Sequence, residues 1–163
     1  MYRRWDNNFL MAHFAKVVDG IVEQVTVVAN EVLEDENGDE QESLGQTFLT
    51  DTFGEATWVQ CSYNENIKKR FPGVGDLYDT DNDLFHKPKP YPSWVLNTTT
   101  GYWEAPIAKP TVSSEGVSID GDDVGTELDC RWDEDAYQAD NTTGWVVLTM
   151  DLYTGDLEDT GVY

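Results

Sequence analysis

Residues 13–29 have the sequence HFAKVVDGIVEQVTVVA and predict a β-hairpin. Two runs of strand-forming residues, His13 to Val18 and Ile21 to Ala29, flank Asp19-Gly20. Asp-Gly between such runs is the strongest short-range signal for a two-residue hairpin turn. The second run also alternates in part between apolar and polar side chains, as a half-buried strand does. We therefore expect an antiparallel pair of strands in this part of the chain.

The sequence after the hairpin predicts a short helix and a further strand. Residues 43–53 favour a helix, because Leu44, Phe48 and Leu49 are spaced to share one face. The glycine at position 54 ends the pattern. Trp58 to Tyr63 then alternates in the manner of a strand.

A recurring pattern places an aromatic residue on each side of a polar turn. The turns contain Asp and Asn, which initiate chain reversals through side-chain bonds to the backbone, and Gly, which supplies positive φ. Aromatic residues that face each other across a hairpin stabilise it by roughly 0.2–1 kcal/mol per pair. The expected pairs are Tyr78 with Phe85, Trp94 with Trp103, and Trp132 with Trp145, followed by a weaker copy from Leu152 to Leu157.

The predicted fold class is mainly β, with antiparallel hairpins in a small sheet or sandwich and at most one or two short helices. We expect an N-terminal extension over residues 1–11, a β-rich core domain over 12–110 and an acidic β-appendage over 111–163. The second boundary follows from charge, since Arg131 is the only basic residue after Thr111. The expected core residues are Phe14, Val17, Ile21, Val25, Val27, Phe48, Trp58, Tyr78, Trp94, Leu96 and Trp103.

The net charge of -22 over 163 residues excludes several classes of function. A surface this acidic repels the DNA backbone and anionic lipid, so we expect neither a nucleic-acid nor a membrane partner. Disordered acidic chains are poor in aromatic residues, whereas this chain contains 12% with six Trp, which favours a folded protein. Cys61 and Cys130 match no disulfide framework or zinc spacing, and we expect two reduced, packed thiols.

No catalytic constellation is apparent, and we expect neither enzymatic activity nor a cofactor. His13 and His86 are expected to be structural or surface residues, and the sequence lacks phosphate-binding loops, nucleophile elbows and helical zinc motifs. Asp79, Asp81 and Asp83 alternate in one turn and are candidate calcium ligands. A solvated turn is the favoured alternative, because the spaced glycine and distant glutamate of the helix–loop–helix calcium site are missing.

The most distinctive motif lies at residues 85–97, where PKPYPSW follows Phe85 and leads to Asn97 and then to WEAP at 103–106. Further motifs are Met11 to Ala15, Val25 to Val28 with Asn30, Trp58 with Ser62-Tyr63-Asn64, Arg70 with Gly73, Gly75 and Tyr78-Asp79, and an echo at Arg131 to Asp135 and Trp145. Together they resemble a virion-associated protein family of tailed phages of marine cyanobacteria and related bacteria. The resemblance covers about residues 11–110; the residues before Met11 and after Thr111 extend beyond it. It implies a structural role in the particle and carries over no catalytic residues.

We therefore expect a non-enzymatic assembly or decoration (cement) protein of a phage virion, on the capsid surface ahead of the tail or neck. It would be made in the host cytoplasm and bind other virion proteins, with a homo-oligomer left open. Two alternatives are a host-glycan-binding protein, whose aromatic rings stack on sugars, and an acidic DNA mimic that inhibits a host protein. Because arginine and aromatic residues carry most interface energy, the expected interface residues are Tyr2, Trp5, Phe9, Lys68, Lys69, Arg70, Tyr91 and Trp94.

Overall fold

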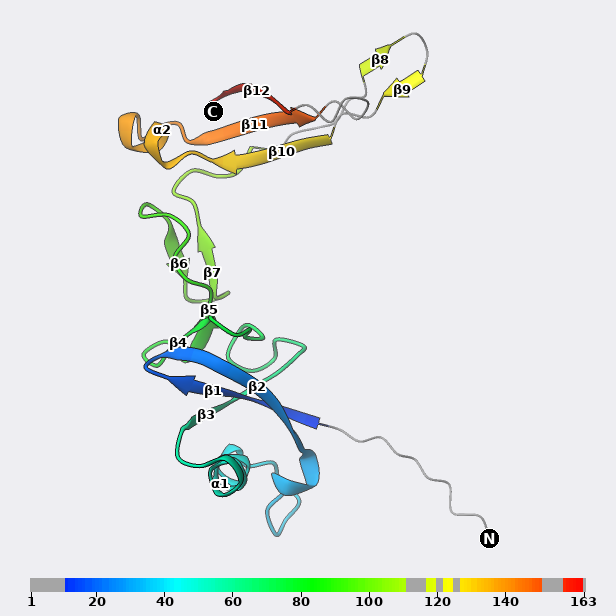
Figure 1. Cartoon of the computed structure of the whole chain (residues 1–163), viewed down its shortest axis with the longest axis vertical. Coiled ribbons are helices and arrows are strands. Elements are labelled where there is room, and N and C mark those ends of the chain that lie inside the picture. The colour runs from blue at the N-terminus through cyan, green and yellow to red at the C-terminus, as the bar shows by residue number, and fades with distance from the viewer. Residues whose placement is uncertain (1–10, 111–116, 120–121, 125–126, 151–156, 163) are drawn as a thin grey trace. The chain divides into compact units, whose positions relative to one another are not determined.

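The computed structural model describes the backbone of residues 11–110, 117–119, 122–124, 127–150 and 157–162, and the side chains of 11–110 and 130–148. Contacts divide the chain into two compact units. Unit 1 contains residues 11–90 and Leu96–Trp103, and unit 2 contains Tyr91–Val95 and the described residues from Glu104 onward. Strands predominate in antiparallel sheets, with two α-helices among the described residues (Figure 1). The expected mainly β fold is confirmed.

The five-stranded sheet of unit 1 contains the predicted hairpin. Strand β1 (Met11–Val18) pairs with β2 (Ile21–Ala29) across a turn in which Asp19 and Gly20 have φ values of 50° and 79°. Two positive φ values identify the type I′ turn that Asp-Gly favours, so the hairpin is confirmed. Strand β3 (Thr57–Cys61) pairs with β1, and β4 (Leu77–Asp79) and β5 (Leu84–His86) follow β2, giving the order β3-β1-β2-β4-β5.

Each face of this sheet carries its own apolar cluster. One cluster includes Leu49 of helix α1 (Glu42–Phe53), and Val32 of the 3₁₀ turn η1 (Asn30–Val32) packs against it. Its buried members are Ala12, Phe14, Val28, Leu33, Leu49 and Trp58. The buried members on the other face are Ala15, Val17, Val22, Val59, Cys61 and Phe85. Alternation along β1 explains the division, since successive side chains of a strand point to opposite faces.

The predicted helix forms, but its buried face differs from the expected one. Gly45 and Leu49 face the sheet, whereas Leu44 and Phe48 are exposed, Phe48 to 43%. The reason is the contact between Gly45 and the buried ring of Phe14, which leaves no room for a side chain at position 45. Placing Phe48 in the core is therefore wrong.

Two further core assignments on β2 and its turn are wrong. Ile21 and Val27 are each 47% exposed. Ile21 directly follows the hairpin turn, and Val27 lies on a stretch of β2 that pairs with β1 but not with β4. By contrast, Phe14, Val17 and Trp58 are buried as expected. The other expected core residues, Val25, Tyr78, Trp94, Leu96 and Trp103, are partly buried.

Two of the expected aromatic hairpins bring their rings together. Tyr78 on β4 faces Phe85 on β5, and the ring centroids are 4.9 Å apart. In unit 2, Trp132 on β10 (Glu127–Trp132) faces Trp145 on β11 (Trp145–Met150) at 5.3 Å. The polar stretch between these two strands contains a short helix, α2 (Glu134–Ala139), which the sequence pattern did not indicate.

The expected pairing of Trp94 with Trp103 is wrong, although the turn between them exists. Strands β6 (Val95–Asn97) and β7 (Tyr102–Glu104) pair with each other, and the Asn97 side chain accepts the N–H groups of Thr99 and Thr100. Trp94 packs within unit 2, whereas Trp103 belongs to unit 1. The weaker copy at Leu152 to Leu157 lies largely outside the described residues.

Unit 2 is organised around a cluster of tryptophans. Trp94, Trp132 and Trp145 lie within 6.2 Å of one another, measured between ring centroids. The sheet continues from β11 to β12 (Leu157–Val162), and β8 (Val117–Ile119) pairs separately with β9 (Asp122–Val124).

The boundary between the two units lies earlier in the chain than the change in charge near Pro110 indicates. Tyr91, Ala105 and Ile107 pack against the tryptophan cluster of unit 2, so Tyr91–Val95 and the chain from Glu104 belong there. Apolar packing rather than charge sets this division, because buried area supplies the dominant stabilising term. Residues 1–10 of the expected N-terminal extension lie outside the described residues.

Candidate functional site

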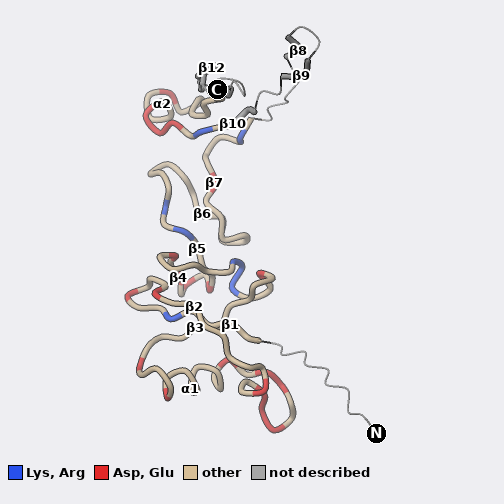
Figure 2. The backbone as a smooth tube through the Cα atoms, turned by 45° about the vertical axis from the view of Figure 1, so that its right-hand side comes forward, with Lys and Arg blue, Asp and Glu red and all other residues tan. Residues whose placement is uncertain are grey.

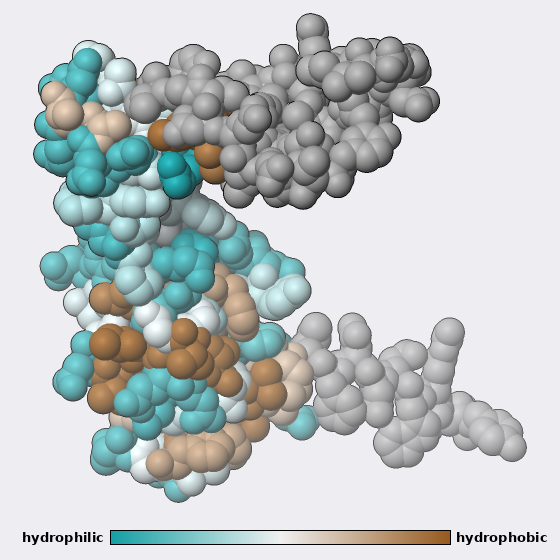
Figure 3. All heavy atoms as spheres, turned by 45° about the horizontal axis from the view of Figure 1, so that its top comes forward, coloured by the Kyte–Doolittle hydropathy of each residue, from teal (hydrophilic) through white to brown (hydrophobic). Residues whose placement is uncertain are grey.

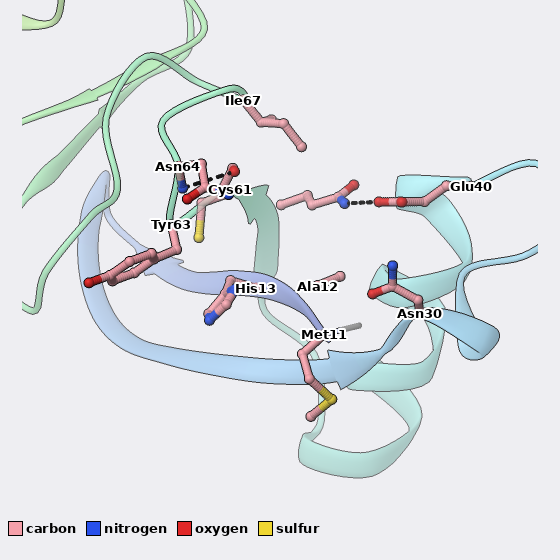
Figure 4. A pocket seen from close by; sticks show the side chains of 11 residues that line it. Met11, Ala12, His13, Asn30, Glu40, Cys61, Tyr63, Asn64 and Ile67 are labelled. Carbon is pink, nitrogen blue, oxygen red and sulfur yellow. Dashed lines mark hydrogen bonds between the residues drawn. The ribbon is translucent and has the colours of Figure 1, made fainter. Parts of the chain in front are cut away.

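A pocket of about 250 Å³ opens in unit 1 where β1 begins and β3 ends (Figure 4). Met11, Ala12 and His13 from β1 and Gln60 and Cys61 from β3 form part of its wall. The remaining lining residues come from the turn after β2, the loop before helix α1 and the chain after β3: Asn30, Glu40, Ser62, Tyr63, Asn64 and Ile67. The pocket therefore combines side chains from four segments that are distant in sequence.

One wall of the pocket presents hydrogen-bond acceptors. The Glu40 carboxylate accepts a hydrogen bond from the Gln60 side-chain amide, as Figure 4 shows. The Oδ1 atom of Asn30 is buried and has no hydrogen-bond partner among the described residues. A buried acceptor of this kind is costly unless a donor reaches it. The arrangement suits a small group that donates hydrogen bonds.

The cysteine in the pocket is not an activated nucleophile. Cys61 is 2% exposed, and burial, with a smaller contribution from the charge of Glu42, raises the pKa of its thiol from 9.0 to about 12. Only the thiolate attacks as a nucleophile, so the group stays inert at neutral pH. Cys130 is also buried, and both cysteines are thiols in different units, as the sequence indicated.

The histidine of the pocket has an aromatic neighbour. The His13 ring lies 5.2 Å from the Phe71 ring, edge to face, and Tyr63 contacts Phe71 at 5.6 Å. Such edge-to-face contacts are stabilising packing arrangements. His86 likewise contacts an aromatic ring, that of Trp103, at 5.5 Å. The packing of both histidines is consistent with structural roles.

Two of the three candidate calcium ligands, Asp79 and Asp83, accept hydrogen bonds from the protein instead, and Asp81 is exposed. The Asp79 carboxylate accepts from the N–H groups of Asp81 and Asn82 and from the Asn82 side-chain amide, and these bonds lower its pKa. Asp83 accepts from Lys68 Nζ at 2.8 Å and from the Tyr78 hydroxyl at 2.5 Å. Nowhere in the part of the chain that the structure describes do three His, Cys, Asp or Glu side chains gather to hold a metal. The turn is thus closed by its own hydrogen bonds.

The hydrogen bond between Tyr78 and Asp83 lowers the pKa of Asp83 and raises the pKa of Tyr78. Burial raises the pKa of Asp83, but the bonds from Lys68 and Tyr78 outweigh it, and the pKa lies below 3.8. Burial, followed by the hydrogen bond to Asp83, raises the pKa of Tyr78. The pair is therefore a neutral phenol donating to a carboxylate across the neutral pH range.

Four of the five described residues that were expected at an interface have contacts within the protein. The side chain of Lys68 is 14% exposed and pairs with Asp83, and the Arg70 guanidinium lies 4.2 Å from the centroid of the Tyr102 ring. Lys69 is exposed. Tyr91 and Trp94 pack into unit 2. Tyr2, Trp5 and Phe9 lie outside the described residues, and an interface role for all eight stays a prediction.

Glu134 holds together two segments of unit 2 and was not anticipated from the sequence. Its carboxylate accepts from the backbone N–H and hydroxyl of Ser93, from Trp132 Nε1 and from the Gln138 side chain. Burial opposes ionisation, but these bonds together lower its pKa. Because Glu134 is distant in sequence from Ser93, only the folded structure reveals the link.

No family model, curated protein or solved structure matches the chain. No helix within the described ranges is long and apolar enough to cross a membrane. The physical chemistry of the residues therefore has to support any functional assignment.

Proposed function

We propose that this chain is a non-enzymatic structural protein of a phage particle that binds other virion proteins. The proposal rests on the contacts and the burial of the groups that could otherwise carry out chemistry. The candidate carboxylates close turns and hold segments together, and the pocket cysteine is a buried thiol. Such groups stabilise a fold, whereas catalysis needs them aimed at a substrate.

The sequence motifs at residues 11–110 support the same role through their resemblance to virion-associated phage proteins. The distinctive segment at 85–97 now has a structural interpretation. Its residues Tyr91 and Trp94 enter the core of unit 2, while Phe85 is fully buried in unit 1. Residues of the motif thus belong to the cores of both units, which serves folding and assembly rather than catalysis.

Within the particle, a decoration or cement position on the capsid surface is the leading proposal, ahead of the tail or neck. A net charge of -22 keeps such a protein soluble and separate from nucleic acid before assembly. The acidic residues are spread over many segments of the described backbone, as Figure 2 shows. This dispersal suits contacts with basic partner surfaces.

The glycan-binding alternative has less support. Trp94, Trp132 and Trp145 pack against one another, so their faces are not presented as a platform for sugars. A DNA mimic would array its carboxylates at phosphate-like spacing. Here Asp35, Asp79 and Asp140 each accept backbone N–H groups of their own turns, which disfavours that array.

The test is quantitative mass spectrometry of purified particles of the phage that encodes the chain. We expect the protein to remain at a fixed ratio to the major capsid protein through gradient purification and nuclease treatment. A non-virion phage protein expressed at the same time serves as the control and should be removed. Cross-linking of the same particles identifies the neighbouring proteins and separates capsid from tail. Absence of the chain from the particles would overturn the proposal.

A further inference from the structure

The five-stranded sheet has one outer edge at β3, and helix α1 covers it. The Gln46 side chain donates to the carbonyl of Trp58 at 2.8 Å, and the Glu42 carboxylate accepts the N–H of Gln60 at 2.8 Å. An uncovered edge offers unpaired N–H and C=O groups to other chains, and proteins commonly block it. Here two helix side chains do so.

The opposite edge, at β5, is also covered. Phe85 donates its backbone N–H to the carbonyl of Lys68 at 3.2 Å. A Cβ atom on Gly101 would lie 3.0 Å from the Phe85 carbonyl oxygen, so the chain at Gly101 passes close to the same edge. Both formal ends of the sheet are thus protected from further strand pairing.

Strand β2 is a third edge, and much of it is open. It pairs with β1 along its whole length, but with β4 only at Ile21 opposite Leu77. Two more bonds join Val22 to Gly75 and Asp76. Within the described residues, no backbone hydrogen bond reaches the outer side of β2 between Val25 and Ala29.

The register identifies which groups point outward. Val18 and Ile21 flank the two-residue turn and form a hydrogen-bonded pair. After the bulge at Glu23 the register resumes, so Gln24, Thr26 and Val28 direct their backbone groups to β1. Alternate residues of a strand face opposite sides in the sheet plane. Val25, Val27 and Ala29 therefore direct their N–H and C=O groups away from the sheet.

This open edge has the composition that favours strand addition. Val25, Thr26 and Val27 are β-branched, and the whole of β2 lacks the Lys and Pro that usually guard an edge. Val27 is 47% exposed, and Figure 3 shows apolar side chains at the surface of unit 1. Short β-branched segments with few charges readily accept a further strand.

The charges around the edge indicate what would bind. Glu23 pairs with Lys16 at 2.9 Å, whereas Glu31 and Glu34, beyond the other end of β2, are exposed. A second copy of the chain would bring another net charge of -22 and, paired antiparallel about Val27, would bring the turn that contains Glu31 close to Glu23 of the other copy. Charge complementarity instead favours a segment with basic residues at its ends.

We propose that the outer edge of β2, from Val25 to Ala29, binds an extended segment of a partner protein whose apolar residues alternate and are flanked by Lys or Arg. The segment adds to the sheet as a further strand. Main-chain hydrogen bonds to Val25, Val27 and Ala29 supply the affinity, and the acidic flank supplies selectivity. That the partner is a virion protein rests on the proposed function.

The probe for this proposal is an acetylated, amidated peptide, Arg-Val-Thr-Val-Thr-Val-Arg, added to the full chain. Amide hydrogen exchange followed by NMR should show new protection at Val25, Val27 and Ala29. A peptide with Glu at both ends should bind about tenfold more weakly, because two exposed ion pairs become repulsions. A peptide with proline in place of the central Val should not bind, since proline cannot extend the ladder.

Two variants locate the site. Val27→Pro removes an outward N–H and should abolish protection, while the matched Val27→Thr keeps the N–H and should bind as the wild type does. Because Val27→Pro can also weaken the fold, Glu31→Lys serves as an independent variant at an exposed position. It should largely remove the preference for the Arg-flanked over the Glu-flanked peptide, because the charge at one end of the site is then reversed.

Three results would overturn the proposal: no new protection, equal binding of the proline-containing peptide, or protection at Val25–Ala29 that grows with protein concentration alone. The last would identify a second copy of the chain as the occupant. Finding the chain in particles without any peptide-dependent protection would leave the proposed function intact. Peptide binding by a chain that is absent from particles would support strand addition at β2 and overturn the proposed function.

Discussion

The Glu42 carboxylate accepts the backbone N–H of Gln60 at 2.8 Å, which joins the first turn of helix α1 to the outer edge of strand β3. One helical turn later, Gln46 donates to the carbonyl of Trp58. Residues four apart on a helix lie on the same side, and alternate residues of a strand direct their backbone groups to one edge. The helix thus satisfies two backbone groups of the strand without a further strand.

Replacing Glu42 with Ala should destabilise the protein by about 1–3 kcal/mol, because the N–H of the buried residue Gln60 would lose its acceptor. Urea unfolding followed by circular dichroism measures the change. Glu42→Gln retains a side-chain oxygen and should lose less stability than Glu42→Ala. Comparing the two variants separates the contribution of the hydrogen bond from that of the charge. Asp51→Ala, on an exposed part of the same helix, is the surface control. Equal midpoints for Glu42→Ala and the control would contradict the edge-capping role.

Gly45 should not tolerate alanine, although alanine is the better helix former by roughly 1 kcal/mol. A Cβ at this position would lie 2.8 Å from Phe14 Cε2 and closer still to Cζ, and the Phe14 ring is fully buried. Overpacking of this kind costs about 1–3 kcal/mol. Urea unfolding should show that Gly45→Ala is less stable than the wild type. In the double variant with Phe14→Leu, the smaller leucine side chain should reduce this loss of stability. A more stable Gly45→Ala variant would show that α1 does not pack against Phe14.

The bounds of α1 follow closely from its sequence, but its rotation about its own axis does not. The spacing of Leu44, Phe48 and Leu49 indicates a helix, and Gly54 marks its end. The largest apolar residues were expected to face the core. The buried face is instead set by Gly45, because close approach to Phe14 depends on a missing side chain. A pattern of apolar residues cannot reveal that contact.

Local turn chemistry was predictable in the same way, and long-range partners were not. Asp19-Gly20 specifies its turn through backbone preference alone, and the turn at Asn97 likewise forms as expected. Trp94, by contrast, packs against Trp132 and Trp145 rather than against Trp103. The pocket residues also come from separate segments of ordinary composition, so no short motif indicates them.

Cys61 should resist alkylation in the native protein. Raising the pKa of its thiol from 9.0 to about 12 lowers the thiolate fraction at pH 8 about a thousandfold, and the side chain is 2% exposed. Mass spectrometry of peptides after timed iodoacetamide treatment should find Cys61 unlabelled in the native state and labelled in denaturant. Scoring each cysteine separately distinguishes Cys61 from Cys130. Native labelling of Cys61 at the denatured rate would show that the pocket exposes a reactive thiol.

The hydrogen bonds of Asp83 should make a pH-dependent contribution to stability. Its pKa in the folded protein lies below 3.8, so the folded state favours the charged carboxylate. That contribution is fully present above the unfolded pKa, and it disappears as the pH falls through the folded pKa. Asp83→Asn is a suitable variant, because position 83 has a φ of 53°, which asparagine tolerates.

The urea midpoint of Asp83→Asn should therefore lie below that of the wild type at pH 6, and the gap should shrink as the pH falls below about 4. Asp81→Asn, an exposed residue of the same turn, removes an equal charge and controls for the general relief of acidic repulsion. If both variants changed stability alike at every pH, the effect would be net charge alone. A loss of stability seen only for Asp83→Asn, and only above about pH 4, would instead identify the bonds from Lys68 and Tyr78 as the cause. Only the ionised carboxylate accepts both bonds.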